Sequence, residues 1–289
     1  MKFNRIEVND MASYTKRKRI NLIFVYTLAI LLSVVFIIPL IFTISNSLRD
    51  LYSSPVLIPD KLNWSNYHLA VTLIPFWRYV RNSGIITGIS VSFAICMNFL
   101  FGYAFSRLRA PGKNAMFILV LSMLMVPAIA VQIPQFVIFS NIGIKDTYWI
   151  WILNGIGGNA FYIFLFRQFL ASLPKDLEDA ARIDGCNTFS IIWRIFVPLS
   201  WPVIAVVGML DFNGAWGDYM TGYMFLSPKN YPLATALIST SYTIPNQPTI
   251  QLEPVVNAAA LLLTLPIIVV FFLGQRYLVE GIVTTGIKG

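Results

Sequence analysis

Charge, cysteine and histidine are all scarce in this sequence, and each shortage excludes a class of protein. Only 12% of the 289 residues are charged, whereas a soluble globular chain carries about twice that share. The hydrophobic content of 57% excludes a disordered chain. Cys96 and Cys186 are too few for a disulfide scaffold, and the single histidine, His68, cannot form a histidine metal site. A polytopic membrane protein is the class that remains.

The basic surplus does not indicate a nucleic-acid-binding protein. Lys and Arg number 21 against 13 Asp and Glu, which gives a net charge of +8. A nucleic-acid-binding protein gathers its basic residues on a polar surface, and this chain is too apolar to offer one. We therefore expect a lipid bilayer around the chain, its basic residues outside the bilayer, and no nucleic-acid partner.

Long apolar runs predict six transmembrane helices, because about 20 apolar residues are needed to cross the hydrocarbon core. Five runs lack Asp, Glu, Lys and Arg, and a sixth is interrupted only by Asp211 and Asp218. The runs are continuous rather than alternating, which favours helices over the strands of a membrane barrel. The predicted spans cover residues 20–46, 80–106, 114–141, 148–168, 199–226 and 254–276.

Two other charge-free stretches, 62–77 and 230–252, are expected to be loops. The first is short, and the second is dense in Pro, Ser, Thr, Asn and Gln. The first apolar run is too long for a signal peptide and lacks a small-residue cleavage site. The sequence thus predicts a single all-α membrane domain over residues 1–289.

The distribution of basic residues predicts the orientation of the spans. With the N-terminus inside, 15 of the 21 Lys and Arg residues fall on cytoplasmic segments. Short cytoplasmic loops carry such an excess. Both termini are therefore expected in the cytoplasm, and so is the loop of residues 172–198 between the fourth and fifth spans.

The loop of residues 172–198 is expected to form two short helices. Pro174 suits a first helical turn, and Asp176 or Asp179 can accept hydrogen bonds from free N–H groups there. Gly185 suits a left-handed stop. A second helix begins at Asn187 or Thr188, carries apolar residues at helical spacing and is limited by Pro198. From these residues alone, a solvated helical linker and a contact surface for a partner are equally good interpretations.

This loop resembles the EAA loop of ABC importer permeases, in which Glu-Ala-Ala precedes a glycine and an Ile-x-Leu-Pro group follows. Asp179, Ala180 and Ala181 precede Gly185 at the family's spacing, and Ile195 and Pro198 complete the pattern. Asp179 stands where Glu is usual and Val197 where Leu is usual. The resemblance implies ATPase coupling through Glu178, Asp179, Ala180, Ala181, Asp184, Gly185, Ile195 and Pro198. Glu178 and Asp179 are both candidates for the key contact.

The wider chain resembles the maltose-type carbohydrate permeases, specifically their MalG-like subunit. The matching segments include Asn66-Tyr67, Asn82-Ser83, Arg107-Leu108-Arg109 and the tail from Gln275 to Gly281. The resemblance implies a permease of an ATP-driven importer in the bacterial cytoplasmic membrane. Its expected partners are a second, homologous permease, two ATP-binding subunits and an extracytoplasmic binding protein that delivers a carbohydrate, an oligosaccharide in this interpretation.

An enzyme is not expected. Gly112-Lys113 lacks the earlier glycine and the following Ser or Thr of a phosphate-binding loop, so ATP and Mg are expected on the partner ATPase, with no cofactor on this chain. The sequence shows no set of catalytic residues and no metal cluster. A stand-alone secondary transporter or channel for a small polar solute is the alternative, although no inverted repeat is evident.

Polar residues inside the apolar runs are the candidates for a substrate pathway, since acids at membrane depth are costly. Asp211 and Asp218 are seven residues apart and are expected on one helix face. They either pair with groups of the partner permease or contact sugar hydroxyls, with Trp216 or Tyr219 offering a ring. Asn98, Gln132, Asn154 and Asn159 are further polar groups, and Pro127 and Pro134 are expected to interrupt a helix. Tyr148, Trp149 and Trp151 fit an interfacial belt.

Overall fold

The computed structural model is almost wholly helical and describes residues 3–55, 57–239, 242–244 and 247–286. Its helices, in chain order, are α1 (Phe3–Leu48), α2 (Ser65–Thr72), α3 (Phe76–Arg107), α4 (Lys113–Ser122), the 3₁₀ turn η1 (Met123–Met125), α5 (Ala128–Asn141), α6 (Trp149–Gly157), α7 (Ala160–Ser172), α8 (Asp176–Ile183), α9 (Thr188–Ile191), the π-helical turn η2 (Ile192–Phe196), α10 (Val197–Leu199), α11 (Trp201–Gly217), α12 (Met220–Phe225), α13 (Leu233–Ser239) and α14 (Glu253–Gly286). The strands β1 (Thr243–Ile244) and β2 (Gln247–Gln251) pair in antiparallel fashion. Two compact units are present, one of residues 1–70 and 242–261 and the other of residues 71–241 and 262–289.

Three helices are each long and apolar enough to cross a membrane: α1 over Asn21–Leu48, α3 over its whole length and α14 over Glu253–Leu278. Three bent pairs pass the same test together. The bend is 97° between α4 and α5, 44° between α6 and α7, and 77° between the segment Thr188–Leu199 and α11. The described residues thus hold three to six candidate spans by length and composition.

The breaks between paired helices have local causes. Pro127 precedes α5 in an extended conformation, with ψ of 127°, and Pro lacks the N–H that would continue a helix. Gly158 has a φ of 73° and Asn159 caps α7, its side chain accepting hydrogen bonds from the N–H groups of Phe161 and Tyr162. The predicted interruption at Pro134 is wrong, because this proline lies inside α5.

The first unit, of residues 1–70 and 242–261, is held by hydrogen bonds around the end of α1. Arg49 is only 4% exposed, and its Nη2 atom lies 2.6 Å from Oε2 of Glu253 at the start of α14. The Asn66 amide donates to the carbonyls of Ser47 and Arg49, each at 2.8 Å. The Tyr242 hydroxyl donates to the Ala70 carbonyl at 3.0 Å. Each of these contacts satisfies a buried polar group.

The two stretches predicted as loops contain short elements instead. Residues 62–77 include α2, and residues 230–252 include α13 and the β1–β2 hairpin. The hairpin is the one departure from the predicted all-α class in the part of the chain that the structure describes. These elements form without long apolar runs because tertiary contacts support them. Asn66 of α2 is fully buried, as is Leu233 of α13.

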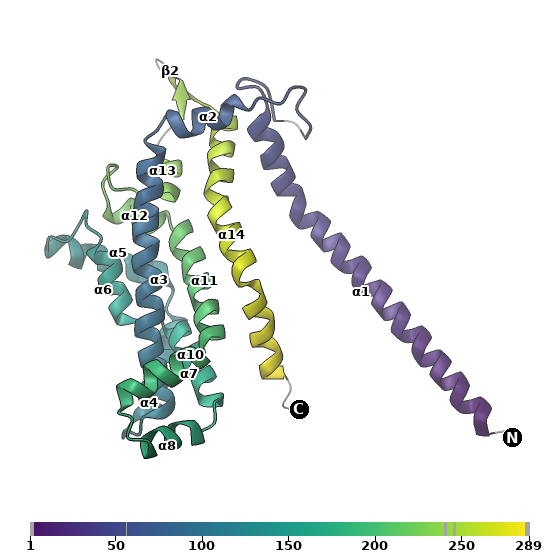
Figure 1. The fold of residues 1–289 in the computed structure, drawn as a ribbon. Coiled ribbons are helices and arrows are strands. Elements are labelled where there is room, and N and C mark those ends of the chain that lie inside the picture. The colour runs from purple at the N-terminus through teal and green to yellow at the C-terminus, as the bar shows by residue number, and fades with distance from the viewer. Residues whose placement is uncertain (1–2, 56, 240–241, 245–246, 287–289) are drawn as a thin grey trace. The chain divides into compact units, whose positions relative to one another are not determined.

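The second unit is built around α3, which packs against α6, α7 and α11 (Figure 1). Phe99 of α3 and Phe166 of α7 meet edge to face, with ring centroids 5.4 Å apart. The two helices approach closely at Gly102, where an added Cβ would lie 2.5 Å from the Cβ of Phe166 and 2.9 Å from the backbone nitrogen of Arg167. Glycine at this position therefore sets the spacing between α3 and α7.

Gly102→Ala is expected to destabilise the second unit by about 1–3 kcal/mol, because the backbone of α7 must move to admit the methyl group. Gly88→Ala in the same helix is the matched control, since nothing lies within 4 Å of its added Cβ, and it should be neutral or slightly stabilising. Thermal unfolding of the two variants in detergent measures the difference. Equal unfolding temperatures would contradict the close packing at Gly102.

Candidate functional site

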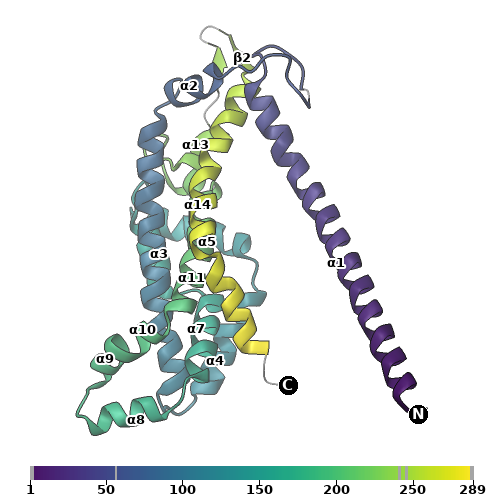
Figure 2. The ribbon, with the colours of Figure 1, turned by 45° about the vertical axis from the view of Figure 1, so that its right-hand side comes forward.

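The two short helices predicted for the loop of residues 172–198 are present as α8 and α9, and we call them, with the turn between them, the knob (residues 176–191; Figure 2). Gly185 forms the turn with a left-handed φ of 78°. The Asn187 side chain caps α9 by accepting a 2.8 Å hydrogen bond from the Ser190 N–H. Lys175, rather than Asp176 or Asp179, occupies the cap position of α8. Pro198 does not end the second helix, which continues through η2 and α10 to Leu199.

The knob shares its hydrophobic core with the long helices of the second unit. Ala181, Ile191 and Phe196 are buried in one cluster with Tyr103 of α3 and Phe166 of α7. Ile195 packs against this cluster, whereas Pro198 is exposed. A displacement of the knob must therefore displace residues of α3 and α7, because close-packed cores transmit strain.

Arg107 joins three segments at the base of the knob. Its guanidinium donates to the carbonyls of Leu170 and Leu173 at the end of α7, at 2.5 and 2.7 Å. It also lies 4.9 Å from the ring centroid of Phe196 in η2, which is within cation–π distance. Tyr103, one turn earlier in α3, packs edge to face on the same ring at 5.4 Å. Phe196 thus contacts two side chains of α3, and we call this pair of contacts the clamp.

The acidic residues of the knob differ in their surroundings. Glu178 is only 12% exposed and pairs with Arg182 at 2.7 Å; it also interacts electrostatically with the Tyr103 hydroxyl. Asp179 and Asp184 are exposed, as are Ala180 and Gly185. Between these two acids, the side chain of Ile183 is 86% exposed. The outer face of the knob therefore offers two carboxylates around an apolar side chain.

A second feature lies among the apolar helices, where residues of α3, α6, α7 and α11 line a hollow of about 250 Å³ that we call the polar hollow. Its polar lining residues are Ser90, Asn98, Asn154, Asn159, Tyr162 and Asp211. Trp151 adds an aromatic wall. A carboxylate, amides, hydroxyls and an aromatic ring are the groups that fix polar ligands in otherwise apolar pockets.

The break between α6 and α7 forms one wall of the polar hollow. The Asn98 side chain accepts a 2.6 Å hydrogen bond from the Asn159 N–H and donates to the Ala94 carbonyl at 2.6 Å. Asn154 accepts a hydrogen bond from Gln135 of α5. Backbone that is not helical is tolerated at membrane depth where protein or a water-filled cavity surrounds it.

Asp211 supplies the only carboxylate among the residues that line the polar hollow. The hydroxyls of Ser90 and Tyr162 interact electrostatically with its carboxylate. Its Oδ2 atom is buried and has no protein partner among the described residues. A buried carboxylate oxygen without a donor is costly, so this atom is available to a ligand donor such as a hydroxyl group.

The structure brings together two of the five predicted pathway residues, Asn154 and Asp211. Asp218 ends α11 and accepts a 3.1 Å hydrogen bond from the Thr221 N–H, so it does not share a helix face with Asp211. Trp216 is buried, stacks on Phe212 and donates to the Leu263 carbonyl at 2.9 Å. Gln132 lies on α5, outside the lining of the polar hollow.

Sequence reasoning missed Ser90 and Tyr162 and assigned Trp151 to an interfacial belt. Ser90 and Tyr162 are isolated hydroxyl residues in apolar helices, and no local pattern distinguishes them. Trp151 is buried among the other lining residues. The signal available was its position three residues before Asn154, which places both on one face of a helix.

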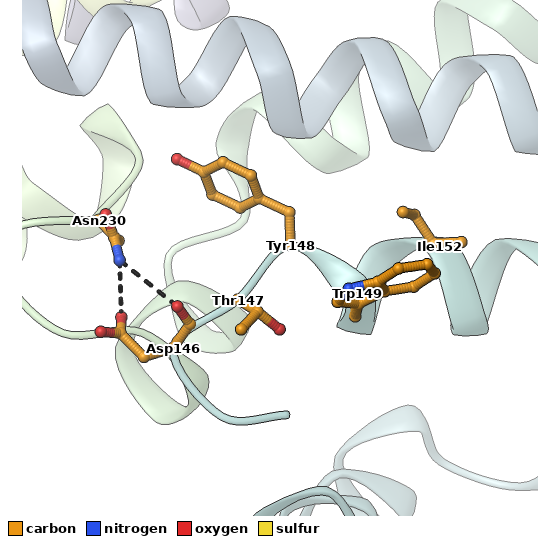
Figure 3. Close-up of a pocket in the computed structure, with 6 residues that line it drawn as sticks. All are labelled: Asp146, Thr147, Tyr148, Trp149, Ile152 and Asn230. Atoms are coloured by element: carbon orange, nitrogen blue, oxygen red, sulfur yellow. Dashed lines mark hydrogen bonds between the residues drawn. The ribbon is translucent and has the colours of Figure 1, made fainter. Parts of the chain in front are cut away.

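A third feature, at the opposite end of α3 from the knob, is a hollow of about 360 Å³ lined by Asp146, Tyr148, Trp149 and Asn230 among others (Figure 3). Asp146 has a φ of 62° and accepts hydrogen bonds from the N–H and hydroxyl of Ser227 and from the Asn230 amide. Burial acts to raise the pKa of Asp146, but these bonds and the charge of Lys229 together lower it. These hydrogen bonds join the loop between α5 and α6 to the loop between α12 and α13. The stability they contribute is fully present above the ordinary carboxyl pKa and is lost as the pH falls through the lowered pKa of Asp146.

This arrangement of helices is the fold of an ABC transporter membrane subunit. The chain superposes on the solved structure of a bacterial ABC transporter involved in the import of the acidic polysaccharide alginate with a TM-score of 0.76. The match covers 90% of this chain and 96% of the other at 23% identity, which establishes the fold alone.

Sequence comparison gives the family. Residues 94–283 match the family described as binding-protein-dependent transport system inner membrane component, and the chain belongs to it. It is 30% identical to the galactooligosaccharides transport permease GanQ of Bacillus subtilis (strain 168), over 96% of this chain and all of the relative. It is 28% identical to the maltose/maltodextrin permease MalG of Escherichia coli (strain K12), over 95% and 98% of the two chains. The resemblance to maltose-type permeases is confirmed, and the protein is a transport subunit rather than an enzyme.

Proposed function

We propose that this permease forms, with a second homologous permease, the membrane pathway of an ATP-driven importer for an oligosaccharide. The observation that carries the proposal is the polar hollow lined by residues of apolar helices in a chain of this family. The relatives named for galactooligosaccharides and maltodextrin support a carbohydrate substrate. A stand-alone transporter or channel has no comparable support.

In this proposal, residues 1–289 form one multi-pass domain in the bacterial cytoplasmic membrane. Each bent pair of helices counts as one span, which gives six, and both termini lie in the cytoplasm. The distribution of the basic residues supports this orientation, because 15 of 21 then lie on the cytoplasmic side. The knob is then cytoplasmic, and the hollow at Asp146 faces outward.

The polar hollow contacts the sugar as it passes. Sugar hydroxyls both donate and accept hydrogen bonds, and Asp211, Asn154 and Tyr162 offer groups of both kinds. The unpartnered Oδ2 atom of Asp211 accepts from a hydroxyl. The Trp151 ring lies along the apolar face of the sugar. Gln132, Trp216 and Asp218 do not line this hollow, and no sugar contact is proposed for them.

The knob contacts one of two ATP-binding subunits, which hold ATP and Mg. Asp179 rather than Glu178 makes the key contact, because Glu178 faces inward and is paired with Arg182 whereas Asp179 is exposed. Asp184, Ala180 and Gly185 complete the contact surface. Closure of the ATPase dimer moves the knob, and the clamp of Tyr103 and Arg107 on Phe196 passes that motion to α3 and α7.

The extracytoplasmic binding protein meets the segments of residues 49–78 and 229–253, which the proposed topology assigns to the outer side of the membrane. The long exposed apolar faces of α4 and α5, with Met116, Leu119 and Ile133 each more than 60% exposed, face lipid or the second permease. Such apolar surface is expected only where a bilayer or a partner covers it.

Asp211→Asn is expected to lower uptake of the sugar carried by the binding protein by roughly tenfold to a hundredfold, because a charge-assisted hydrogen bond is lost. Affinity of the binding protein for its sugar should not change, since that site is on another chain. Asp218→Asn is the matched control, because Asp218 only caps a helix turn. Transport assays in proteoliposomes measure the effect. Equal losses in the two variants would exclude the polar hollow as a sugar contact.

Asp179→Lys is expected to reduce both uptake and substrate-stimulated ATP hydrolysis on the order of tenfold or more, since it reverses a charge at the ATPase contact. Asp179→Glu, which restores the usual residue of the family motif, should retain both activities. Asp10→Lys, with the same charge change in the N-terminal segment that the proposed topology places in the cytoplasm, controls for net charge. Immunoblots confirm membrane levels. Full activity of Asp179→Lys would disprove this contact.

A further inference from the structure

A third hollow, of about 560 Å³, lies beside the knob and has a strongly basic lining that neither coupling nor sugar transport explains. We call it the basic hollow. Its walls come from the end of α3, the turn that leads to α4, the end of α7 and the first turns of α8. Its size is within the range of about 300–1,000 Å³ that accommodates small ligands.

Positive charges predominate among the charges that line the basic hollow. Five are cations, contributed by Arg107, Arg109, Lys113, Lys175 and Arg182. Two are the carboxylates of Glu178 and Asp179, so five positive and two negative charges leave a net charge of +3. Such a lining attracts an anion and disfavours a neutral sugar.

Internal contacts use some of these cations but not all. Arg107 donates to the end of α7, Lys113 donates to the Leu108 carbonyl at 2.7 Å, and Arg182 pairs with Glu178. Within the described residues, the side chains of Arg109 and Lys175 have no hydrogen bond or ion pair to protein, and both are exposed. These two come from different walls, Arg109 from the turn after α3 and Lys175 from the N-cap position of α8, directly before the knob.

The basic hollow lies where one candidate membrane span ends and the next begins. Arg107 is the last residue of one candidate span, and Lys113 is the first residue of the next. The turn between them therefore lies at the level of the lipid headgroups. Basic pockets at the cytoplasmic ends of transmembrane helices bind anionic headgroups, and Arg and Lys can lay their aliphatic stems along the acyl boundary while the charge reaches the phosphate.

We propose that the basic hollow binds the phosphate of an anionic phospholipid, with Arg109 and Lys175 as its main contacts. The bound headgroup bridges the turn after α3 and the N-cap residue of α8, directly before the knob. Anionic lipid thereby holds the knob in the position set by the Arg107 contacts. This inference requires only that the chain spans a membrane, so it does not depend on the identity of the transported sugar.

Two other anions offer the same chemistry. Soluble inorganic phosphate could occupy the hollow, and so could an acidic segment of the ATPase. A lipid is favoured because the hollow lies at the junction of two spans, where headgroups are concentrated. Of the proposed ATPase contact residues, only Asp179 lines it.

The test measures lipid binding by the chain purified together with the subunits that co-extract with it. The complex is placed in phosphatidylcholine nanodiscs with increasing phosphatidylglycerol, and native mass spectrometry counts the phosphatidylglycerol that remains bound. R109Q/K175Q should weaken retention roughly 30-fold, from about 1 kcal/mol per basic residue near the surface. The control K145Q/K229Q removes the same charge from segments that do not line the hollow and should retain lipid as the parent does. R109K/K175R, which keeps the charge, should recover most of the binding.

Three results would overturn the proposal. Equal retention by R109Q/K175Q and K145Q/K229Q would show that no specific site exists. Displacement of phosphatidylglycerol by millimolar inorganic phosphate would assign the hollow to a soluble anion. A third result has two parts: R109Q/K175Q loses the ATPase in pure phosphatidylcholine, and it retains phosphatidylglycerol as the parent does in mixed nanodiscs. That result would assign the hollow to the ATPase instead.

Discussion

The proposed coupling depends on the contacts of the Phe196 ring with Tyr103 and Arg107. These contacts place a residue that follows the knob against two residues at the end of α3. Because α3 also packs against α6, α7 and α11, a force on the knob reaches every helix that lines the polar hollow. A knob attached through a flexible linker could bind an ATPase without moving the pathway.

The polar hollow depends on breaks in the helices rather than on their continuity. Gly158 and Asn159 interrupt the segment of α6 and α7, and Asn98 of α3 satisfies the N–H that the break exposes. The break lets amides enter a wall that would otherwise be apolar. Asp211 lines the same hollow, where it interacts with the hydroxyls of Ser90 and Tyr162, and its Oδ2 atom has no protein partner among the described residues. The break between α6 and α7 therefore also supplies polar groups to the hollow, Asn159 among them.

Much of the fold and part of the site could be predicted from the sequence. Apolar runs located the helices, and Gly185 and Asn187 located the turn and the second helix of the knob, because these signals are local. The prediction was wrong where long-range contacts decide the outcome. Asp211 and Asp218 were expected on one face, but α11 ends between them; α2 and α13 form within predicted loops because buried hydrogen bonds and packing support them. Ser90 and Tyr162 join Asp211 only through packing of three helices, which no spacing in the sequence encodes.

The central claim is that motion of the knob reaches the pathway through the clamp on Phe196. The most direct test is the number of sugar molecules imported per ATP hydrolysed in the reconstituted importer carrying Arg107→Gln, which removes the charge that contacts Phe196. The account predicts that the ATPase stays bound and still hydrolyses ATP while this ratio falls severalfold, and that Arg194→Gln, an exposed arginine of η2, leaves it unchanged. An unchanged ratio in Arg107→Gln would contradict the account.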